Sequence, residues 1–330
     1  MAELRLGLCC LNTELRQQKP PVFASRGCRL DTINKMGISK CIELANQNID
    51  DLYTMAHWNR MHNISVFRLS SDIFPHITNP LVDLSKYQLD LFSDKLKKFG
   101  RYANALGQRL TFHPGQFNVL GTPNLDCLAK TTYELHIHAS ILDYMECPAD
   151  SIMVIHGGGM YGDKRAAMDR WCKNYMKLPQ YVRDRLVLEN CEKCFNIEDC
   201  LEISRRIGVP VVLDNHHFDC YNLMHQDAQL KYRIDEYIPQ VLDTWTQKGI
   251  RPKFHISEQG CGRTGHHSDF ITELPDYYLE IVDKYKRDEE LTYLRGCSDK
   301  LLKEINVSFE YDFEKMIHEM VDYHLNNLKR

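Results

Sequence analysis

Short apolar runs alternate along most of the chain with longer stretches in which hydrophobic residues recur at helical spacing. Short runs rich in β-branched and aromatic residues are typical of buried strands, whereas an apolar residue at every third or fourth position is typical of a helix packed on one side. The runs predict strands at residues 4–10, 66–71, 109–113, 151–158, 185–190, 209–217, 252–257 and 305–310. The longer stretches predict helices at residues 31–61 with a break near Gly37, at 85–106, 125–146, 163–177, 197–207, 226–248 and 269–286, and from about Phe313 onward.

Strands that alternate with helices predict a parallel sheet with right-handed crossover connections. Eight such units in 330 residues are the number that closes a (β/α)8 TIM barrel, an α/β fold whose chemistry lies at the C-terminal ends of the strands. A doubly wound open sheet is the alternative, but it should carry a glycine-rich phosphate-binding turn after the first strand. The segment from Gly7 to Asn12 is not such a turn, and no linker or repeat divides the chain, so we expect one domain over residues 1–330.

Residues of metal-binding type stand where six consecutive predicted strands end. A single histidine at a strand end is more simply a hydrogen-bonded core residue, but a barrel would bring all of these ends to one face. Imidazoles and carboxylates without thiols suit zinc, manganese or iron. We therefore predict two or three divalent ions, most simply Mn²⁺, with Zn²⁺ or Mg²⁺ as alternatives. The candidate ligands are His113, His156, Glu189, Asp214 with His216 and His217, His255 and Glu310, together with His267 in the loop after the seventh strand.

Three of the candidate residues are expected to act in catalysis: Glu189, Lys253 and His255. Adjacent divalent ions can activate water and neutralise charge on a phosphate, and a carboxylate such as Glu189 can bridge two of them. Lys253 lies two residues before His255 and so shares its side of the strand. Near cations it can be a neutral amine or a carbamate ligand, and an ion pair with Asp214 or Glu310 is the structural alternative.

The amino-acid composition says more about the cellular compartment of the protein than about its binding partner. Hydrophobic residues make up 43% and charged residues 26% of the chain, and the net charge of −4 neither indicates nor excludes nucleic acid. The 13 cysteines, in a chain whose start is not of targeting type, are expected to be reduced core residues of an intracellular, soluble protein. Cys191 and Cys194 have zinc-pair spacing without a second pair, and no apolar run approaches a membrane span.

Two segments favour DNA as the partner. The loop after the first strand carries Arg16, Lys19, Arg26 and Arg29 without an acidic residue between them, a pattern that suits either phosphate binding or an ordinary solvated surface. After His113, the Pro-Gly pair predicts a turn with Gln116 and Phe117 at its tip, close to the predicted metal site. An exposed aromatic ring there could occupy the space left when damaged bases leave the stack.

The motifs of the chain resemble the UV damage endonucleases, which are related in fold to endonuclease IV and to sugar isomerases. The resemblance covers most of the chain, and its motifs are Asn48–Leu52, Trp58–Pro75, Phe112–Phe117, Ile155–Gly158, Leu188–Asn190, Leu213–His217, Lys253–Ser257 and His267–Asp269. It implies a barrel enzyme that nicks duplex DNA immediately 5′ to an ultraviolet photoproduct, without ATP and without a protein partner. By the same motifs, the metal ligands would be the candidates named above without His216. Lys253 would be the metal-site lysine, and Asn12, Gln116 and Phe117 would contact the lesion.

The chain departs from the family pattern at three places. Leu8 and Phe117 stand where tyrosine is common, so a hydroxyl is lost at both, although stacking at 117 is retained. The last motif reads Glu310-Tyr-Asp312 where the family usually continues Glu-Ala-Lys. An abasic-site endonuclease, a sugar isomerase and a non-catalytic binder of damaged DNA are the competing functions. The Trp58–Pro75 motif and the basic loop favour DNA over a sugar.

Overall fold

The computed structural model describes residues 5–226, 230 and 232–278. The chain divides into two compact units, Arg5–Leu274 and a second unit of Met1–Leu4 with Pro275–Arg330, of which only 275–278 are described. The account below concerns the first unit. The predicted eighth strand, the closing helix and Glu310 lie outside the described residues.

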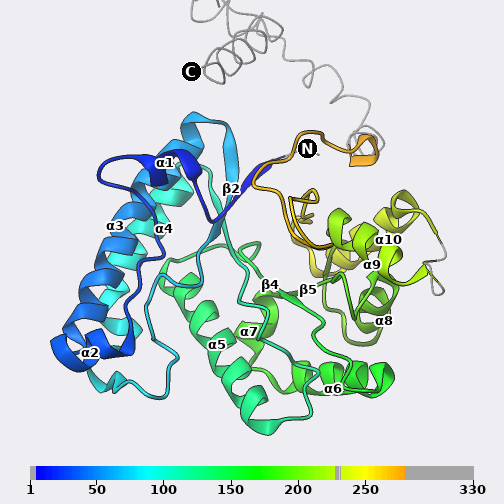
Figure 1. The fold of residues 1–330 in the computed structure, drawn as a ribbon, viewed down its shortest axis with the longest axis horizontal. Coiled ribbons are helices and arrows are strands. Elements are labelled where there is room, and N and C mark those ends of the chain that lie inside the picture. Colours follow the sequence, from blue (N-terminus) through cyan, green and yellow to red (C-terminus); the bar gives the residue numbers. More distant parts are fainter. Residues whose placement is uncertain (1–4, 227–229, 231, 279–330) are drawn as a thin grey trace, which may run out of the picture. The chain divides into compact units, whose positions relative to one another are not determined.

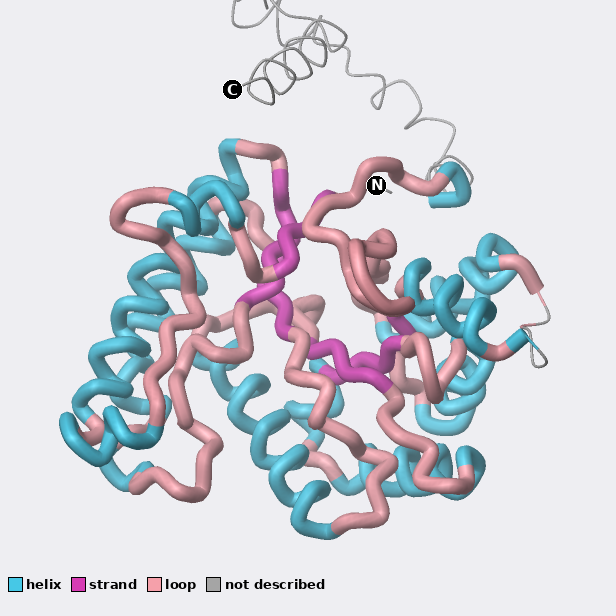
Figure 2. The backbone as a smooth tube through the Cα atoms, viewed as in Figure 1, coloured by secondary structure: helices cyan, strands magenta, loops and turns pink. Residues whose placement is uncertain are grey.

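A six-stranded parallel sheet forms the centre of this unit, with its strands in the order of the sequence (Figure 2). The strands are β1 Leu6–Cys9, β2 Ile64–Leu69, β3 Arg109–Phe112, β4 Met153–His156, β5 Leu186–Glu189 and β6 Val211–Val212. The first five lie within or beside the predicted strands. The α/β class with a parallel sheet is thus confirmed, whereas closure into an eight-stranded barrel and a single domain over residues 1–330 stay predictions.

Helices follow the strands, and the helices with the most contacts to one another are consecutive or separated by one helix in the chain (Figure 1). They are α1 Thr13–Gln17, α2 Leu30–Met36, α3 Ser39–Met61, α4 Ser93–Ala105, α5 Leu125–Tyr144, α6 Lys164–Lys177, α7 Gln180–Arg185, α8 Ile197–Ile207, α9 Asn215–Met224 and α10 Ile234–Lys248, with short 3₁₀ helices η1 Leu84–Lys86 and η2 Leu89–Phe92. The break at Gly37 is confirmed, because this residue has a φ of 76°. No helix among the described residues is long and apolar enough to cross a membrane.

The core lies between the sheet and the helices. Alternation along β2 shows how it forms: Phe67 and Leu69 are buried at 0% and 1% exposure, and Arg68 between them points to the other face. Phe112 at the end of β3 packs its ring edge-on against His138 of α5, which places this side of β3 against the helices. The opposite side of the strands is therefore left for polar residues.

Two of the predicted strands are much shorter than expected. The sixth ends at Val212, because the carboxylate of Asp214 accepts a hydrogen bond from the backbone N–H of His217 and so caps α9, which places His217 in the first turn of a helix. The seventh is reduced to a single parallel bridge between His255 and Asp214 within the described residues. The prediction of strand through His217 was wrong.

The helix predictions after these strands also need correction. The helix expected from residue 226 begins at Ile234. Residues 269–274 are not helical; a helical segment appears at 276–278, and the residues beyond are not described. The short helices α1 and α7 were not predicted, because neither has an apolar stripe long enough to show helical periodicity.

Candidate metal centre

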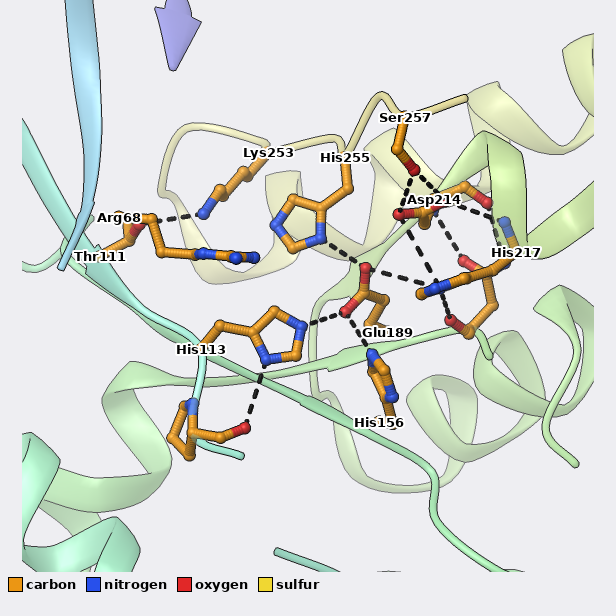
Figure 3. A network of polar contacts seen from close by, with 12 residues as sticks. Arg68, Thr111, His113, His156, Glu189, Asp214, His217, Lys253, His255 and Ser257 are labelled. Atoms are coloured by element: carbon orange, nitrogen blue, oxygen red, sulfur yellow. Dashed lines mark hydrogen bonds and ion pairs between the residues drawn. The ribbon is translucent and has the colours of Figure 1, made fainter. Parts of the chain in front are cut away.

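Glu189 is the centre of the polar cluster at the C-terminal end of the sheet (Figure 3). It is the last residue of β5, pairs in register with His156 of β4 and is 0% exposed. Its Oε2 atom lies 2.7 Å from Nε2 of His113 and 3.0 Å from Nε2 of His156, while Oε1 is hydrogen-bonded to Nδ1 of His255. The histidines at the ends of β3 and β4 and at the bridge of residue 255 therefore all point at the carboxylate that ends β5.

Two groups of potential ligands share this carboxylate. His113, Glu189 and His255 form one group, and His156, Glu189 and His217 form the other, with the ligand atoms of each group within 4.8 Å of one another. This spacing allows each group to surround one cation. The shared Glu189 is then in the position that a bridging ligand requires.

Asp214 and His267 extend the second group. Nε2 of His217 lies 3.2 Å from Nε2 of His267, and Nδ1 of His217 lies 3.8 Å from Oδ2 of Asp214. Asp214 is only 2% exposed and is positioned by its cap to α9 and by Ser257, whose hydroxyl lies 3.4 Å from both carboxylate oxygens. The structure thus gathers all of the ligands that the motifs imply and that it describes, and only Glu310 lies outside the described residues.

The donor atoms of the cluster fit a cation better than they fit one another. Nε2 of His156 and of His255 are buried and make no hydrogen bond within the described residues, although the former lies 3.0 Å from Glu189. A buried nitrogen without a hydrogen bond carries a desolvation cost that a metal ion would remove. The residues present therefore fit a metal centre of nitrogen and oxygen ligands.

The electrostatics of the group formed by His113, Glu189 and His255 favour protonation states that can bind a metal ion. In the second group, the charge of Glu189 raises the pKa of His156 against the effect of burial. Burial alone would raise the pKa of Glu189, but the imidazoles of His255, His113 and His156 outweigh it and hold this pKa well below its usual range. Burial lowers the pKa of His255 to about 3 and also lowers that of His113, so both rings are neutral near pH 7. An ionised carboxylate and neutral imidazoles are the forms that bind metals.

Comparison with known proteins decides the family. The model of the UV-endonuclease UvdE family matches residues 4–309. The chain belongs to this family.

Relatives and a solved structure agree with the family assignment. A protein of Acanthamoeba polyphaga mimivirus is 35% identical over 314 residues, which cover 93% of this chain and 91% of the viral protein. The UV-damage endonuclease of Schizosaccharomyces pombe is 33% identical over 302 residues, which cover 88% of this chain and 49% of the yeast protein, so the chain spans about half of that relative. The crystal structure of SacUVDE superposes with a TM-score of 0.72 at 28% identity and covers 92% of this chain and 99% of that one.

Lys253, the residue expected to be the family's metal-site lysine, reaches across to β3. Its Nζ donates a 2.9 Å hydrogen bond to the hydroxyl of Thr111, and the structure shows no ion pair with Asp214 among the described residues. Burial lowers the pKa of Lys253 to about 7, with Arg68 and Arg109 adding to the effect. The amine therefore has a large neutral fraction near neutral pH, which both the neutral-amine and the carbamate interpretations require.

The turn expected to contact the lesion is rigidly held. Both the backbone N–H and the side-chain amide of the buried Asn118 donate 3.0 Å hydrogen bonds to the carbonyl oxygen of Gly115. Gln116 and Phe117 lie between these two residues, and Phe117 is 81% exposed. The UV-endonuclease fold thus presents an amide and an aromatic ring to solvent beside His113.

The residues of the first loop differ in their availability to DNA. Arg16, Lys19 and Arg29 are exposed. Arg26 instead forms a 2.7 Å ion pair with Asp51 and donates to the carbonyl oxygens of Phe23 and Pro21, while its guanidinium stacks 4.2 Å from the Phe23 ring. Arg26 therefore holds the loop against α3, and the remaining three cations are the candidates for phosphate contact.

The side chain of Asn12 also has a structural role. Its Oδ1 accepts from the N–H of Leu15 and caps α1, and the side chain is 4% exposed. Its Nδ2 atom is buried and has no hydrogen bond within the described residues, so this nitrogen could bond to a ligand only if the ligand reached it. A contact to a lesion would need the α1 region to open.

Sequence reasoning did not single out three residues near the centre. The side chain of Asn190 forms two hydrogen bonds with the backbone of Asp214, and its carbonyl oxygen lies 3.0 Å from Nδ1 of His217, so it orients both ligands. The acidic residue Glu192 is close enough to His217 and His156 for their charge to lower its pKa, against the effect of burial. Arg68 lies beside Lys253 and Thr111 (Figure 3). The position of Asn190 directly after Glu189 was the one feature of the sequence that could have identified it as a residue of the site.

Proposed function

We propose that the chain is a metal-dependent endonuclease that hydrolyses the phosphodiester bond immediately 5′ to ultraviolet photoproducts in duplex DNA. The family assignment and the relatives named UV-damage endonuclease support the reaction class. The observation that carries the metal dependence is a fully buried carboxylate, Glu189, shared between two groups of histidines at the C-terminal end of a parallel sheet.

In this proposal each ion has its own set of ligands. His113, Glu189 and His255 would hold one ion; His156, Glu189 and His217 would hold a second, with Asp214 and His267 close enough to complete it or to hold a third. We propose Mn²⁺, with Zn²⁺ and Mg²⁺ as alternatives; nitrogen and oxygen donors without a thiolate suit both manganese and zinc. Such ions supply Lewis acidity that activates water and neutralises the charge that develops on a phosphodiester.

The chain's own residues would divide the remaining tasks. Glu189 and His255 would keep the ions in position, and Lys253, with its pKa of about 7, would hold or release a proton at Nζ beside them. Phe117 would stack in the opened duplex and Gln116 would hydrogen-bond to the unpaired bases. Arg16, Lys19 and Arg29 would contact phosphates on either side of the lesion.

Nicking of supercoiled plasmid tests the proposal. With Mn²⁺ present, irradiated plasmid should be converted to the nicked form, unirradiated plasmid should remain supercoiled, and EDTA should abolish the activity. A plasmid carrying abasic sites serves as a second substrate that separates this function from that of an abasic-site endonuclease. Equal nicking of irradiated and unirradiated plasmid, or nicking that survives chelation, would refute it.

A further inference from the structure

Arg68 lies in a row of three side chains on the inner face of the sheet. Cys9 of β1, Arg68 of β2 and Thr111 of β3 are direct neighbours in the two parallel ladders. Phe67 and Leu69, on either side of Arg68, are buried on the opposite face, so the guanidinium points to the face that carries the metal-ligand candidates. Figure 3 shows it extending between Lys253 and the His113–His255 pair.

The guanidinium has five N–H donors, and the fold leaves most of them without an acceptor. Within the described residues, its hydrogen bonding consists of one long contact, 3.7 Å from Nη2 to Sγ of Cys10, and no carboxylate lies within ion-pair distance. Glu189 is close enough to interact with its charge, but both Glu189 oxygens are already engaged by histidines. A thiol is a weak acceptor, so most donors of this guanidinium remain available to a ligand.

Two other arginines, Arg109 at the start of β3 and Arg185 at the end of α7 just before β5, show what a structural arginine looks like here. Arg109 donates to the carbonyl oxygens of Asp150, Pro252 and Arg251. Arg185 binds Asp143 through two nitrogens and donates to the carbonyl oxygens of Cys147, Pro148 and Ser151. Both are buried charged donors that the fold saturates, whereas Arg68 is only half-buried and has no comparable set of acceptors within the described residues.

We propose that Arg68 binds the phosphate that is cut, with its guanidinium hydrogen-bonded to the non-bridging oxygens of the phosphodiester that lies over Glu189. The planar fork of arginine matches two phosphate oxygens, and a partly desolvated site strengthens each charge-assisted bond. The assignment rests on the proposed function and adds the residue that positions its substrate. It also gives a role to the Trp58–Pro75 motif, whose strand otherwise contributes only packing.

A thermodynamic cycle on binding tests the contact separately from turnover. The probes are two duplex oligonucleotides with one dipyrimidine photoproduct, one with the natural phosphodiester 5′ to it and one with an uncharged methylphosphonate at that link. Binding is measured by fluorescence anisotropy with Ca²⁺ in place of Mn²⁺. Arg68→Gln should weaken binding of the natural duplex by about 10- to 100-fold and change binding of the methylphosphonate duplex by less than about 2-fold.

Three controls keep the outcome decisive. Arg68→Lys keeps the charge but loses the fork, so it should fall between the parent and Arg68→Gln, and it replaces Arg68→Gln in the cycle if that variant melts early. Arg165→Gln, which alters an exposed arginine paired with Glu202 on the outer helices, should bind both duplexes like the parent. Metal content by elemental analysis should be unchanged in all three variants.

Equal losses on the two duplexes, or undiminished binding of the natural duplex by Arg68→Gln, would overturn the assignment. Failure of the proposed function would appear differently, as a parent protein that binds irradiated and unirradiated duplex alike. In that case the proposed function is refuted, and the proposed role of Arg68 at the scissile phosphate is refuted as well.

Discussion

The two ends of the parallel sheet solve the same problem of buried polar groups in opposite ways. At the N-terminal end, Arg109 and Arg185 are only 6% and 9% exposed, and the fold supplies acceptors for their guanidinium groups. At the C-terminal end, nitrogens of His156 and His255 are buried without hydrogen bonds within the described residues, and Arg68 has only a thiol. Saturated groups stabilise a fold, whereas unsaturated ones are kept available for a ligand.

The largest expected effect is at the C-terminal end. Glu189→Gln removes the charge that both histidine groups share, so metal content should fall and the single-turnover nicking rate on irradiated plasmid should drop by at least about 10²–10³-fold. Asp214→Asn should show the same pattern. Both variants should still unfold cooperatively by circular dichroism. A Glu189→Gln protein with parental metal content and rate would place the centre elsewhere.

The matching change at the N-terminal end should affect stability only. Arg185→Met leaves Asp143 and three backbone carbonyls without their donor, which should lower the free energy of unfolding by about 2–4 kcal/mol. Urea denaturation measures the loss, and the nicking rate per folded molecule at low temperature should equal that of the parent. A rate defect as large as that of Glu189→Gln would remove the distinction between the two ends.

Phe117 tests how far the ligand-binding end extends beyond the metal-ligand candidates. Phe117→Ala removes an exposed ring that base stacking would use, so the affinity for irradiated duplex should fall by about 1–3 kcal/mol, roughly 5- to 150-fold. Metal content should not change, and Phe117→Tyr, the commoner family residue, should bind at least as well as the parent. Parental binding and nicking by Phe117→Ala would exclude the ring from recognition.

The metal-free protein should be sensitive to acid because of the C-terminal end. The pKa of His255 is about 3 in the folded protein and near 6.5 when unfolded, so the unfolded state takes up a proton first as the pH falls. Stability should be complete above about pH 6.5 and should fall by about 1–2 kcal/mol between pH 7 and pH 5. Denaturant midpoints of chelator-treated protein measure this. His255→Gln should show a shallower dependence, and identical slopes would contradict the assignment to His255.

The smallest expected effect is on the salt dependence of DNA binding, and it distinguishes the exposed cations of the first loop from Arg26. Replacing Arg16 and Lys19 by glutamine should flatten the dependence of log K on log salt by about 0.9 for each phosphate that the protein no longer neutralises, on damaged and undamaged duplex alike. Arg26→Gln should leave that slope unchanged and lower stability, because its guanidinium is bound to Asp51 and backbone carbonyls. A reduced slope in Arg26→Gln would reverse this division.

Periodicity alone predicted much of the fold, and it failed where single contacts decide the backbone. The helix predicted at 197–207 is α8, which is amphipathic and has a capping box between Asn196 and Asp199. The apolar run before Asp214 gave no sign that this carboxylate would turn away and cap a helix. The predicted seventh strand alternates polar and apolar residues as a strand should, yet His255 is the one residue of it that forms a bridge within the described residues.

The candidate site was easier to predict than the roles of its neighbours. Histidines and carboxylates at consecutive strand ends converge because parallel strands end together, so the ligand set followed from topology. Charge pattern could not separate Arg26 from Arg16, since the partner of Arg26 comes from α3. Arg68 lay inside a motif that indicated the family, but only the contacts of Arg109 and Arg185 show that its own donors are unused.

The hydrogen bonds of Asn118 have a consequence for the speed of recognition. Because two bonds from one residue close the Gly115–Asn118 turn, the backbone of Gln116 and Phe117 is already ordered before any duplex arrives. In the proposed function, the protein would then lose little conformational entropy on binding, and the slow event would be the opening of the base stack. Association rates would follow how weakly a lesion is stacked, so the damaged DNA and not the enzyme would set the order in which lesions are found.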